Sequence, residues 1–309
     1  MDIRNGVLEI FDVDHGACAL LSMPSGEPGV HRHILIDCGH STDYNGAPWY
    51  PGNQLRIRGI THVDLLVCTN YDEDHASGAP SLKGQGISVG CILGNPTVPP
   101  EVIEHLKTED GMGNGIKLIA TSLAERRQAG AVQTPPSIPG VSLRWFWNPW
   151  PHWDTENNLS LVAHLSVGGV NFLFPGDMEQ DGFSNLLNFQ SFAALLPGIH
   201  VLMASHHGRE NGKCEAMFDT YGCRPELVII SDCAKRHQSQ ETVPFYYAKA
   251  KGIQGFRSDG GARCLRHAAT VTSGSGGKAA GAMCIERRVL RLIERCAENL
   301  ASKRPVGPS

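Results

Sequence analysis

A short polar segment that follows an apolar run has the residue types of a metal site. Residues 69–78 read TNYDEDHASG, and the run before them, VDLLVC, has the composition of a buried strand. Within six positions stand four candidate ligands: Asn70, Asp72, Asp74 and His75. Carboxylate and imidazole groups of this kind bind divalent cations. The segment therefore predicts a metal centre at the end of a strand.

Three further polar clusters each end an apolar run. They are Asp37-Cys38-Gly39 after ILI, Gly176-Asp177 after NFLFP, and Ser205-His206-His207-Gly208 after HVLMA. Asp and Gly are common in turns, so an ordinary turn explains any one cluster taken alone. Neighbouring strands end at one rim, however, where loops bring distant donors together. We expect the four clusters to meet at one site.

The elements that must position these clusters are short strands and helices. The expected strands cover residues 7–13, 18–21, 33–37, 65–68, 143–147, 159–167, 170–174, 201–204 and 227–230. The expected helices cover roughly residues 100–108, 117–129, 180–195, 213–221 and 241–251, with loops at 109–116 and 130–140. Nearly continuous apolar strands require a covering layer on at least one face. We expect a layered αββα sandwich of the α/β class, although the spacing alone also allows other α/β folds.

Composition narrows the protein class. The 309 residues are 41% hydrophobic and 19% charged, which is typical of a folded globular chain. The formal net charge of −4 gives no global attraction to nucleic acid or anionic membrane. No apolar run approaches the roughly 20 residues that span a bilayer, and no secretory signal pattern opens the sequence. Ten Cys occur without a C-x-x-C pair, so we expect reduced thiols in a cytoplasmic protein with no membrane contact.

The C-terminal part differs in composition from the rest. We expect a hydrolase-like domain at residues 1–272, a flexible linker at 273–281 (SGSGGKAAG), and an amphipathic helix and tail at 282–309. The helix is interpreted as docking on its own domain, with a protein or nucleic-acid contact as the alternative.

The ordered motifs resemble the metallo-β-lactamase fold, and within it the hydrolase domain attached to the competence DNA-uptake channel ComEC and its stand-alone relatives. The matching segments are Asp72-x-Asp74-His75, Phe174-Pro175-Gly176-Asp177, Ser205-His206-His207-Gly208, Phe11 to Ala17, Leu35 to Gly39, Asn158 to Val162, and Ile229 to Ser231 with the later His237. Each motif alone is weakly specific, but their order and approximate spacing hold from about residue 7 to 272.

The resemblance implies two metal sites with a shared carboxylate. Transferred to this chain, site two would contain Asp74, His75, Asp177 and His237, with Asp177 bridging to site one. The implied ligands of site one are Asp72, Asp177, His206 and the weak carbonyl donor Asn70. His207 is expected to orient His206 or contact substrate, and Asp74 to accept a proton besides binding metal.

Site one departs from the family pattern H-x-H-x-D-H. Asn70 and Asp72 stand where the family has two His. Oxygen donors favour Mn²⁺, Mg²⁺ or Ca²⁺ relative to Zn²⁺. We expect an altered active centre holding one or two divalent ions, Zn or Mn with Mg as a third candidate, and greater activity with Mn²⁺ or Mg²⁺ than with Zn²⁺.

The implied chemistry is hydrolysis by a metal-activated water. Relatives of this branch indicate phosphodiester substrates, including nucleic acid, so we expect a phosphodiesterase or nuclease. The alternatives are an ester or lactone hydrolase on the same centre, and a catalytically weak metal-binding module that recognises a nucleotide or a protein. Cations near the histidine motif and His237 could hold a phosphate, although solvated loop charges are the usual case: Arg209, Lys213 and Lys235-Arg236.

Overall fold

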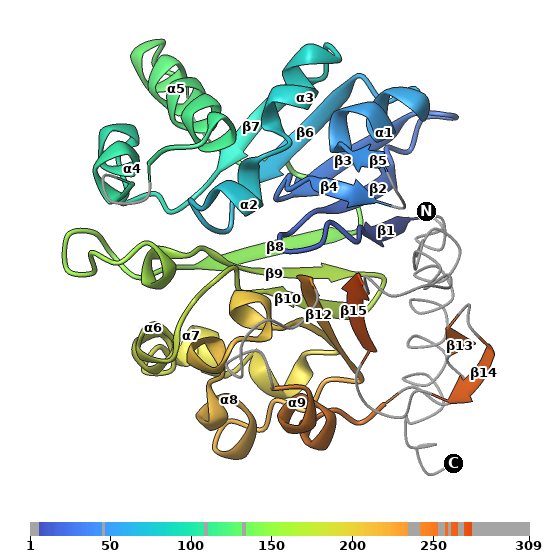
Figure 1. Ribbon diagram of the computed structural model, residues 1–309, viewed down its shortest axis with the longest axis vertical. Coiled ribbons are helices and arrows are strands. Elements are labelled where there is room, and N and C mark those ends of the chain that lie inside the picture. Colours follow the sequence, from blue (N-terminus) through green and yellow to red (C-terminus); the bar gives the residue numbers. More distant parts are fainter. Residues whose placement is uncertain are drawn as a thin grey trace, which may run out of the picture.

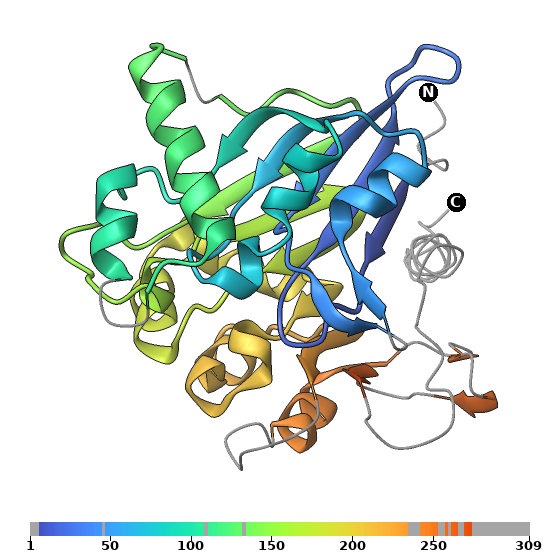
Figure 2. The same ribbon diagram turned by 45° about the horizontal axis from the view of Figure 1, so that its top comes forward.

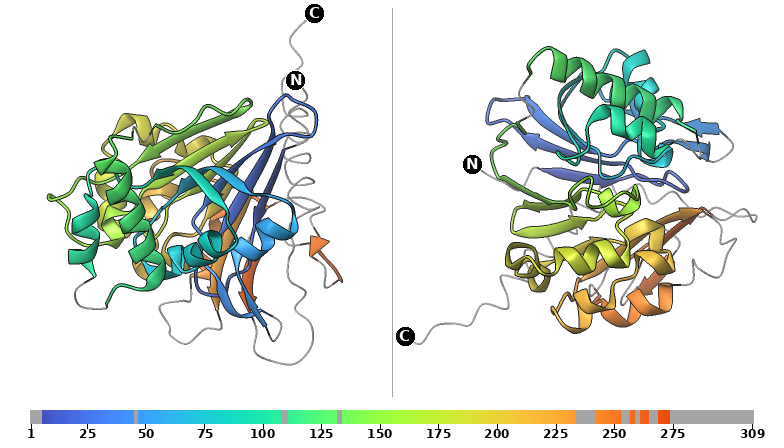
Figure 3. Two further views of the ribbon diagram at one scale, coloured as in Figure 1. Left: turned by 90° about the horizontal axis from the view of Figure 1, so that it is seen from above. Right: turned by 90° about the vertical axis from the view of Figure 1, so that its left-hand side faces the viewer.

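The computed structural model describes residues 6–44, 47–107, 111–131, 134–233, 242–252, 257–258, 261–264 and 269–273. Two sheets pack face to face, and helices cover both outer sides (Figure 1). The same succession of helix, sheet, sheet and helix is visible from the side in Figure 3. The expected αββα sandwich is confirmed.

The first sheet contains five strands in the order β1-β2-β3-β6-β7. Their bounds are β1 Val7–Ile10, β2 Ala19–Pro24, β3 His31–Ile36, β6 His62–Val67 and β7 Ser88–Leu93. Strands β3, β6 and β7 run parallel, so their carboxyl ends lie at one edge. The helices of this half are α1 Pro51–Ile57, α2 Glu73–Ala76, α3 Ala79–Gly84, α4 Pro100–Leu106 and α5 Asn114–Gln128, in front of the sheet in Figure 2.

The second sheet contains six strands in the order β15-β12-β11-β10-β9-β8. Their bounds are β8 Val141–Phe146, β9 Val162–Val167, β10 Val170–Phe174, β11 Val201–Met203, β12 Leu227–Cys233 and β15 Ala269–Ser273. Strands β10, β11, β12 and β15 are parallel. Its helices are α6 Gln180–Leu186, α7 Gln190–Ala193, α8 Glu215–Asp219 and α9 Val243–Lys249. Two small hairpins complete the described strands: β4 Ser41–Tyr44 with β5 Ala47–Trp49, and β13 Arg257–Ser258 with β14 Gly261–Cys264.

Alternation along the strands divides the core into three parts. Successive side chains of a strand point to opposite faces. Ile34 thus packs between the sheets while Leu35 packs under the helices of the first sheet. Phe172 likewise packs between the sheets and Leu173 against the helices of the second sheet. Both faces of each sheet are buried, which explains why the strands are almost continuously apolar.

The boundaries of several expected elements differ from the structure, and two of these differences have a physical reason in the contacts. Helix α5 begins at Asn114, inside the expected loop 109–116, because the Glu73 carboxylate accepts hydrogen bonds from the backbone N–H groups of Gly115 and Ile116 at 2.9 and 3.0 Å. The expected helix 180–195 is two helices. The break at Phe189, whose backbone is extended, lets the fully buried Phe192 pack on Phe146 with ring centroids 5.1 Å apart.

The expectations about cysteines, membrane-spanning helices and the C-terminal segments can be compared with the structure. The described cysteines 18, 38, 68, 91, 214 and 223 are buried free thiols. None of the helices in the described ranges is long and apolar enough to cross a membrane. The expected helix at 282–309 and all of the expected linker except Ser273 lie outside the described residues, so these predictions stand untested.

Candidate metal centre

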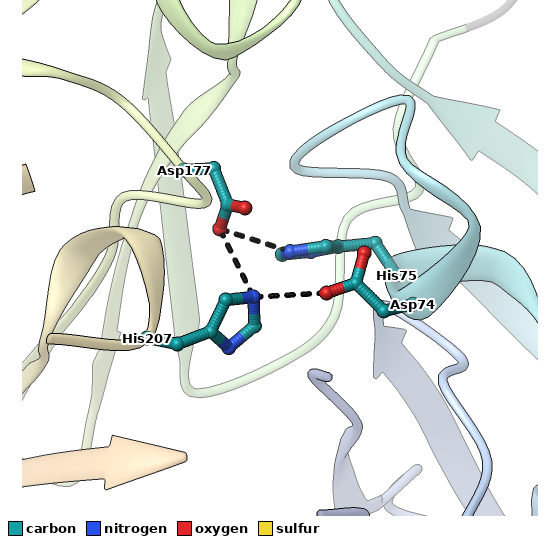
Figure 4. Close-up of side chains that lie close together, drawn as sticks. All are labelled: Asp74, His75, Asp177 and His207. Atoms are coloured by element: carbon teal, nitrogen blue, oxygen red, sulfur yellow. Dashed lines mark hydrogen bonds and ion pairs between the residues drawn. The ribbon is translucent and has the colours of Figure 1, made fainter. Parts of the chain in front are cut away.

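Four side chains from three segments converge where the parallel strands end (Figure 4). Asp74 and His75 lie in α2, directly after β6. Asp177 follows β10, and His207 lies in the short 3-10 turn η4, Ser205–Gly208, after β11. One ligand atom from each of the four residues lies within 4.8 Å of the others.

The separations between these atoms suit a single cation. His75 Nε2 lies 3.0 Å from Asp177 Oδ1. His207 Nε2 lies 3.0 Å from Asp74 Oδ2 and 3.5 Å from Asp177 Oδ1. Tetrahedral zinc with bonds of about 2.0–2.2 Å holds its ligand atoms roughly 3.3–3.6 Å apart. Two carboxylates and two imidazoles also provide the donor types that zinc and manganese accept.

A buried carboxylate orients His75. Asp37 is 2% exposed and follows β3, and its Oδ2 lies 3.0 Å from His75 Nδ1. The same carboxylate accepts hydrogen bonds from the backbone N–H of Thr69 at 2.7 Å and from its hydroxyl at 2.5 Å. A carboxylate behind a ligand imidazole fixes the ring and its tautomer. Nε2 of His75 is thereby directed to Asp177 and the centre.

His207 is oriented by the backbone of the neighbouring strand. Its Nδ1–H donates to the Ser231 carbonyl oxygen in β12 at 2.9 Å, which leaves Nε2 to face the centre. Nε2 is buried and has no well-aligned hydrogen bond within the described part of the chain, although two carboxylates are near it. A buried nitrogen beside carboxylate oxygens is the arrangement that a bound cation satisfies.

The charges of the cluster shift the pKa of its members strongly. Burial alone would raise the pKa of Asp74, but contact with His207 and the charge of His75 lower it to about 2. Burial alone would lower the pKa of His207, but Asp177 and Asp74 raise it to about 10. Despite burial, the pKa of Asp177 is lowered by the two imidazoles and that of His75 is raised by Asp177 and Asp37. The two carboxylates thus remain charged, and the two imidazoles hold protons that a bound cation would displace.

Two expected ligands of site one have other partners. The Asn70 amide donates to Asn157 Oδ1 and to Ser160 Oγ, both at 3.2 Å, and its oxygen accepts from the backbone N–H of Asp72 at 2.8 Å. The Asp72 carboxylate forms an ion pair with the buried Lys107, which also pairs with Glu156. The structure therefore places these two residues beside the cluster of four and in a separate polar network.

Of the two remaining expected ligands, His206 lies at the border of the cluster and His237 lies outside the described residues. His206 borders the cluster, with its Nε2 3.9 Å from Asp177 Oδ2, but it is not one of the four converging residues. His207, which was expected to orient His206 or contact substrate, is itself one of the four converging residues. His237, the last expected ligand of site two, lies outside the described residues.

Three neighbours of the centre were not assigned a role from the sequence. His15 Nε2 lies 3.5 Å from Asp74 Oδ2, and its ring centroid is 4.2 Å from that of His207. Asp37 stood in one of the four strand-end clusters expected to meet, so its place at the rim was predicted, but its contact with His75 was not. Lys107 directly follows α4, and no sequence motif around it indicates a position near the centre.

The fold and this site define the protein class. The family model of the metallo-beta-lactamase superfamily matches residues 29–208, which is more than half of the chain and includes all four residues of the cluster. The chain belongs to the metallo-beta-lactamase superfamily.

A curated relative extends the match. The chain is 24% identical over 240 residues to ComE operon protein 3 of Bacillus subtilis (strain 168), covering 73% of this chain. The chain spans 28% of that relative's length. The resemblance to the ComEC-type branch is confirmed at this level.

Three solved structures are similar to this chain at low identity and low TM-score. CmlA, a diiron beta-hydroxylase from Streptomyces venezuelae, is 13% identical with a TM-score of 0.41, covering 72% of this chain and 44% of that one. Zn²⁺-bound PqqB from Methylobacterium extorquens is 14% identical with a TM-score of 0.34, covering 63% and 71%. A diphosphatase from the PhnP family is 11% identical with a TM-score of 0.33, covering 70% and 73%.

Proposed function

We propose that this protein is a metal-dependent hydrolase that cleaves phosphodiesters, with nucleic acid as a candidate substrate. The observation that carries the proposal is the convergence of Asp74, His75, Asp177 and His207 within 4.8 Å at the edge where the parallel strands end. These residues would hold one divalent cation. That cation would supply Lewis acidity, activating a water and stabilising negative charge that develops on the substrate.

The chain's own residues prepare this site before any substrate binds. Asp37 and the Ser231 carbonyl hold the two imidazoles in the orientation that ligands need. Asp74 is partly exposed, in contrast to the buried Asp177, so it faces the side from which water and substrate enter. Asp74 can therefore accept a proton from the attacking water through a carboxylate oxygen, as well as bind the cation.

The phosphodiester preference is supported by the motifs that resemble the ComEC-type branch and by the 24% identity to ComE operon protein 3. The donor set itself suits other hydrolyses too. A water activated at this site would attack any electrophilic centre bound at the same place. An ester or lactone hydrolase and a catalytically weak metal-binding module are therefore the outcomes against which the proposal is tested.

The test combines metal analysis with substrate comparison. Protein purified without chelators is analysed for bound metal, then stripped and reloaded separately with Mn²⁺, Zn²⁺ and Mg²⁺. Each form is assayed on bis(p-nitrophenyl) phosphate, single-stranded DNA and p-nitrophenyl acetate. We expect one metal per chain and metal-dependent cleavage of the phosphodiesters. Cleavage of the acetate alone would assign an esterase, and bound metal without turnover would assign a binding module.

A further inference from the structure

Arg209 lies at the mouth of the centre and contacts two histidines that border it. Its Nη1 lies 3.2 Å from His206 Nε2, and its Nη2 lies 3.2 Å from His15 Nε2. His206 is next to Asp177, whereas His15 stacks near His207 and lies beside Asp74. The guanidinium thus connects the two sides of the ligand cluster, although residues 15 and 209 are far apart in sequence.

The positive charge of Arg209 is not neutralised by these contacts. A guanidinium can only donate hydrogen bonds, so the Nε2 atoms of His206 and His15 must both act as acceptors. Over the ranges that the structure describes, no carboxylate forms an ion pair with Arg209. A cation without an anionic partner at the edge of a metal centre is placed to receive an anion.

Neighbouring cations differ from Arg209 in this respect. Lys213, in the next turn, pairs with Glu210 and lies 3.3 Å from Glu215 Oε1. Lys107 pairs with Asp72 and Glu156. Both lysines therefore have their charge paired within the protein, whereas Arg209 contacts two imidazoles and forms no ion pair with a carboxylate in the described ranges.

Two donors expected for a second metal ion are engaged by protein cations. His206 Nε2 accepts from Arg209, and the Asp72 carboxylate is held by Lys107. A second cation would have to break both contacts. In this structure Arg209 and Lys107 thus place positive charge beside these two donors.

We propose that Arg209 is the substrate-binding cation of this site and that it donates to the anionic oxygens of a phosphodiester held at the metal centre. This inference rests on the proposed function. The planar guanidinium fits two phosphate oxygens with parallel hydrogen bonds, a fit that a neutral ester does not provide. When substrate arrives, Arg209 exchanges its bonds to the two imidazoles for bonds to these oxygens.

The experiment measures anion binding separately from turnover. Inorganic phosphate is titrated into metal-loaded protein by isothermal calorimetry, using the wild type, Arg209→Gln and Arg209→Lys. We expect Arg209→Gln to weaken phosphate binding by about 10- to 100-fold, because a charge-assisted pair is lost, and Arg209→Lys to weaken it less. Lys213→Gln is the matched control and should bind phosphate as the wild type does, since its charge is already paired.

Kinetics and metal content complete the test. The value of kcat/KM for bis(p-nitrophenyl) phosphate should fall at least as far as the phosphate affinity in Arg209→Gln, and added guanidinium ion should restore part of it. Metal content and circular dichroism should be unchanged, because Arg209 contacts none of the four cluster residues in the hydrogen bonds described. Phosphate binding that depends on Arg209 in a protein without phosphodiesterase activity would support the anion site while refuting the proposed reaction. Wild-type protein that binds no phosphate, or equal affinity in wild type and Arg209→Gln, would overturn the role of Arg209.

Discussion

His75 uses both nitrogens of its ring, and each is assigned to a different carboxylate. Nδ1 faces Asp37 and Nε2 faces Asp177, at 3.0 Å in both cases. A ring held from behind in this way presents its other nitrogen to a metal without further reorganisation. Asp37 therefore acts on the metal through His75 and is a positioning residue.

Replacing Asp37 with Asn should weaken metal binding without removing a ligand. Asn preserves the shape and tolerates the left-handed backbone at this position, where φ is 55°. It lacks the negative charge that stabilises the His75 proton on Nδ1. We expect metal affinity to fall by about 10- to 100-fold, measured by competition with a chromophoric chelator. An affinity equal to that of the wild type would show that Asp37 only closes the turn.

Asp177→Asn should have a larger effect, because Asp177 lies within reach of both imidazoles in the cluster. We expect metal affinity to fall by more than about 100-fold and hydrolysis to be abolished, while circular dichroism stays unchanged. The matched control is Asp181→Asn, four residues later on the exposed surface of α6. Full metal content and normal turnover in Asp177→Asn would refute the centre described here.

At the scale of elements, tight turns after the strands place the ligands. Asp37, His206 and His207 all have positive φ, and the last two are consecutive. A positive φ is unfavourable for most residues other than glycine, and it is retained where the surrounding structure or the function requires it. The turn η4 uses them to direct two adjacent histidines to different partners: His206 to Arg209 and His207 to the cluster.

The turn after Asp37 also fixes helix α2 by close backbone contact. A Cβ at Gly39 would overlap the Asp74 carbonyl oxygen and lie 2.9 Å from that of Ala17. Gly39→Ala should therefore shift α2, and with it Asp74 and His75. We expect a loss of about 1–3 kcal/mol in the free energy of unfolding, from urea denaturation, together with weaker metal binding.

The control for this steric argument is a glycine with free space. Gly84 ends α3, and a Cβ there would meet nothing within 4 Å. Gly84→Ala should change the free energy of unfolding by less than about 1 kcal/mol and leave metal binding intact. Equal effects of the two substitutions would show that loss of chain flexibility, rather than overlap with α2, is responsible.

At the scale of the whole molecule, the metal would connect the two sheets. Asp74 and His75 belong to the half built on the first sheet, and Asp177 and His207 to the half built on the second. A cation bound by all four stabilises the folded state relative to the unfolded chain, in which these ligands are separated. The core between the sheets, which contains Leu65 and Phe172, holds the halves together without it.

Metal binding should therefore raise the thermal midpoint of one transition that includes both halves. At a free metal concentration of about 100 times Kd, the added stability is about 2.7 kcal/mol. Differential scanning calorimetry of chelator-treated and reloaded protein measures this shift, and Asp177→Asn should lose it. Two separate transitions, of which metal moves only one, would show that the ligands do not join the halves.

Much of this architecture was predictable from local patterns. Apolar runs ending in polar clusters indicated the strands and their common edge, because burial on both faces imposes such runs. The motifs at Asp74-His75 and Gly176-Asp177 identified residues that the structure brings together. These features depend on short stretches of chain, and such stretches form the same local structure largely independently of what packs against them.

Other features were decided by tertiary contacts. The sequence favoured His206 over His207 as a ligand, but the two side chains diverge from a turn whose backbone angles cannot be read from residue types. Asp72 was predicted as a metal ligand, which stays a prediction, and in this structure its carboxylate pairs with Lys107, a residue 35 positions later. A carboxylate pairs with whichever cation the fold brings nearest. The distance between the carboxylate and the cation depends on how helices and sheets pack, so a local sequence pattern does not predict it.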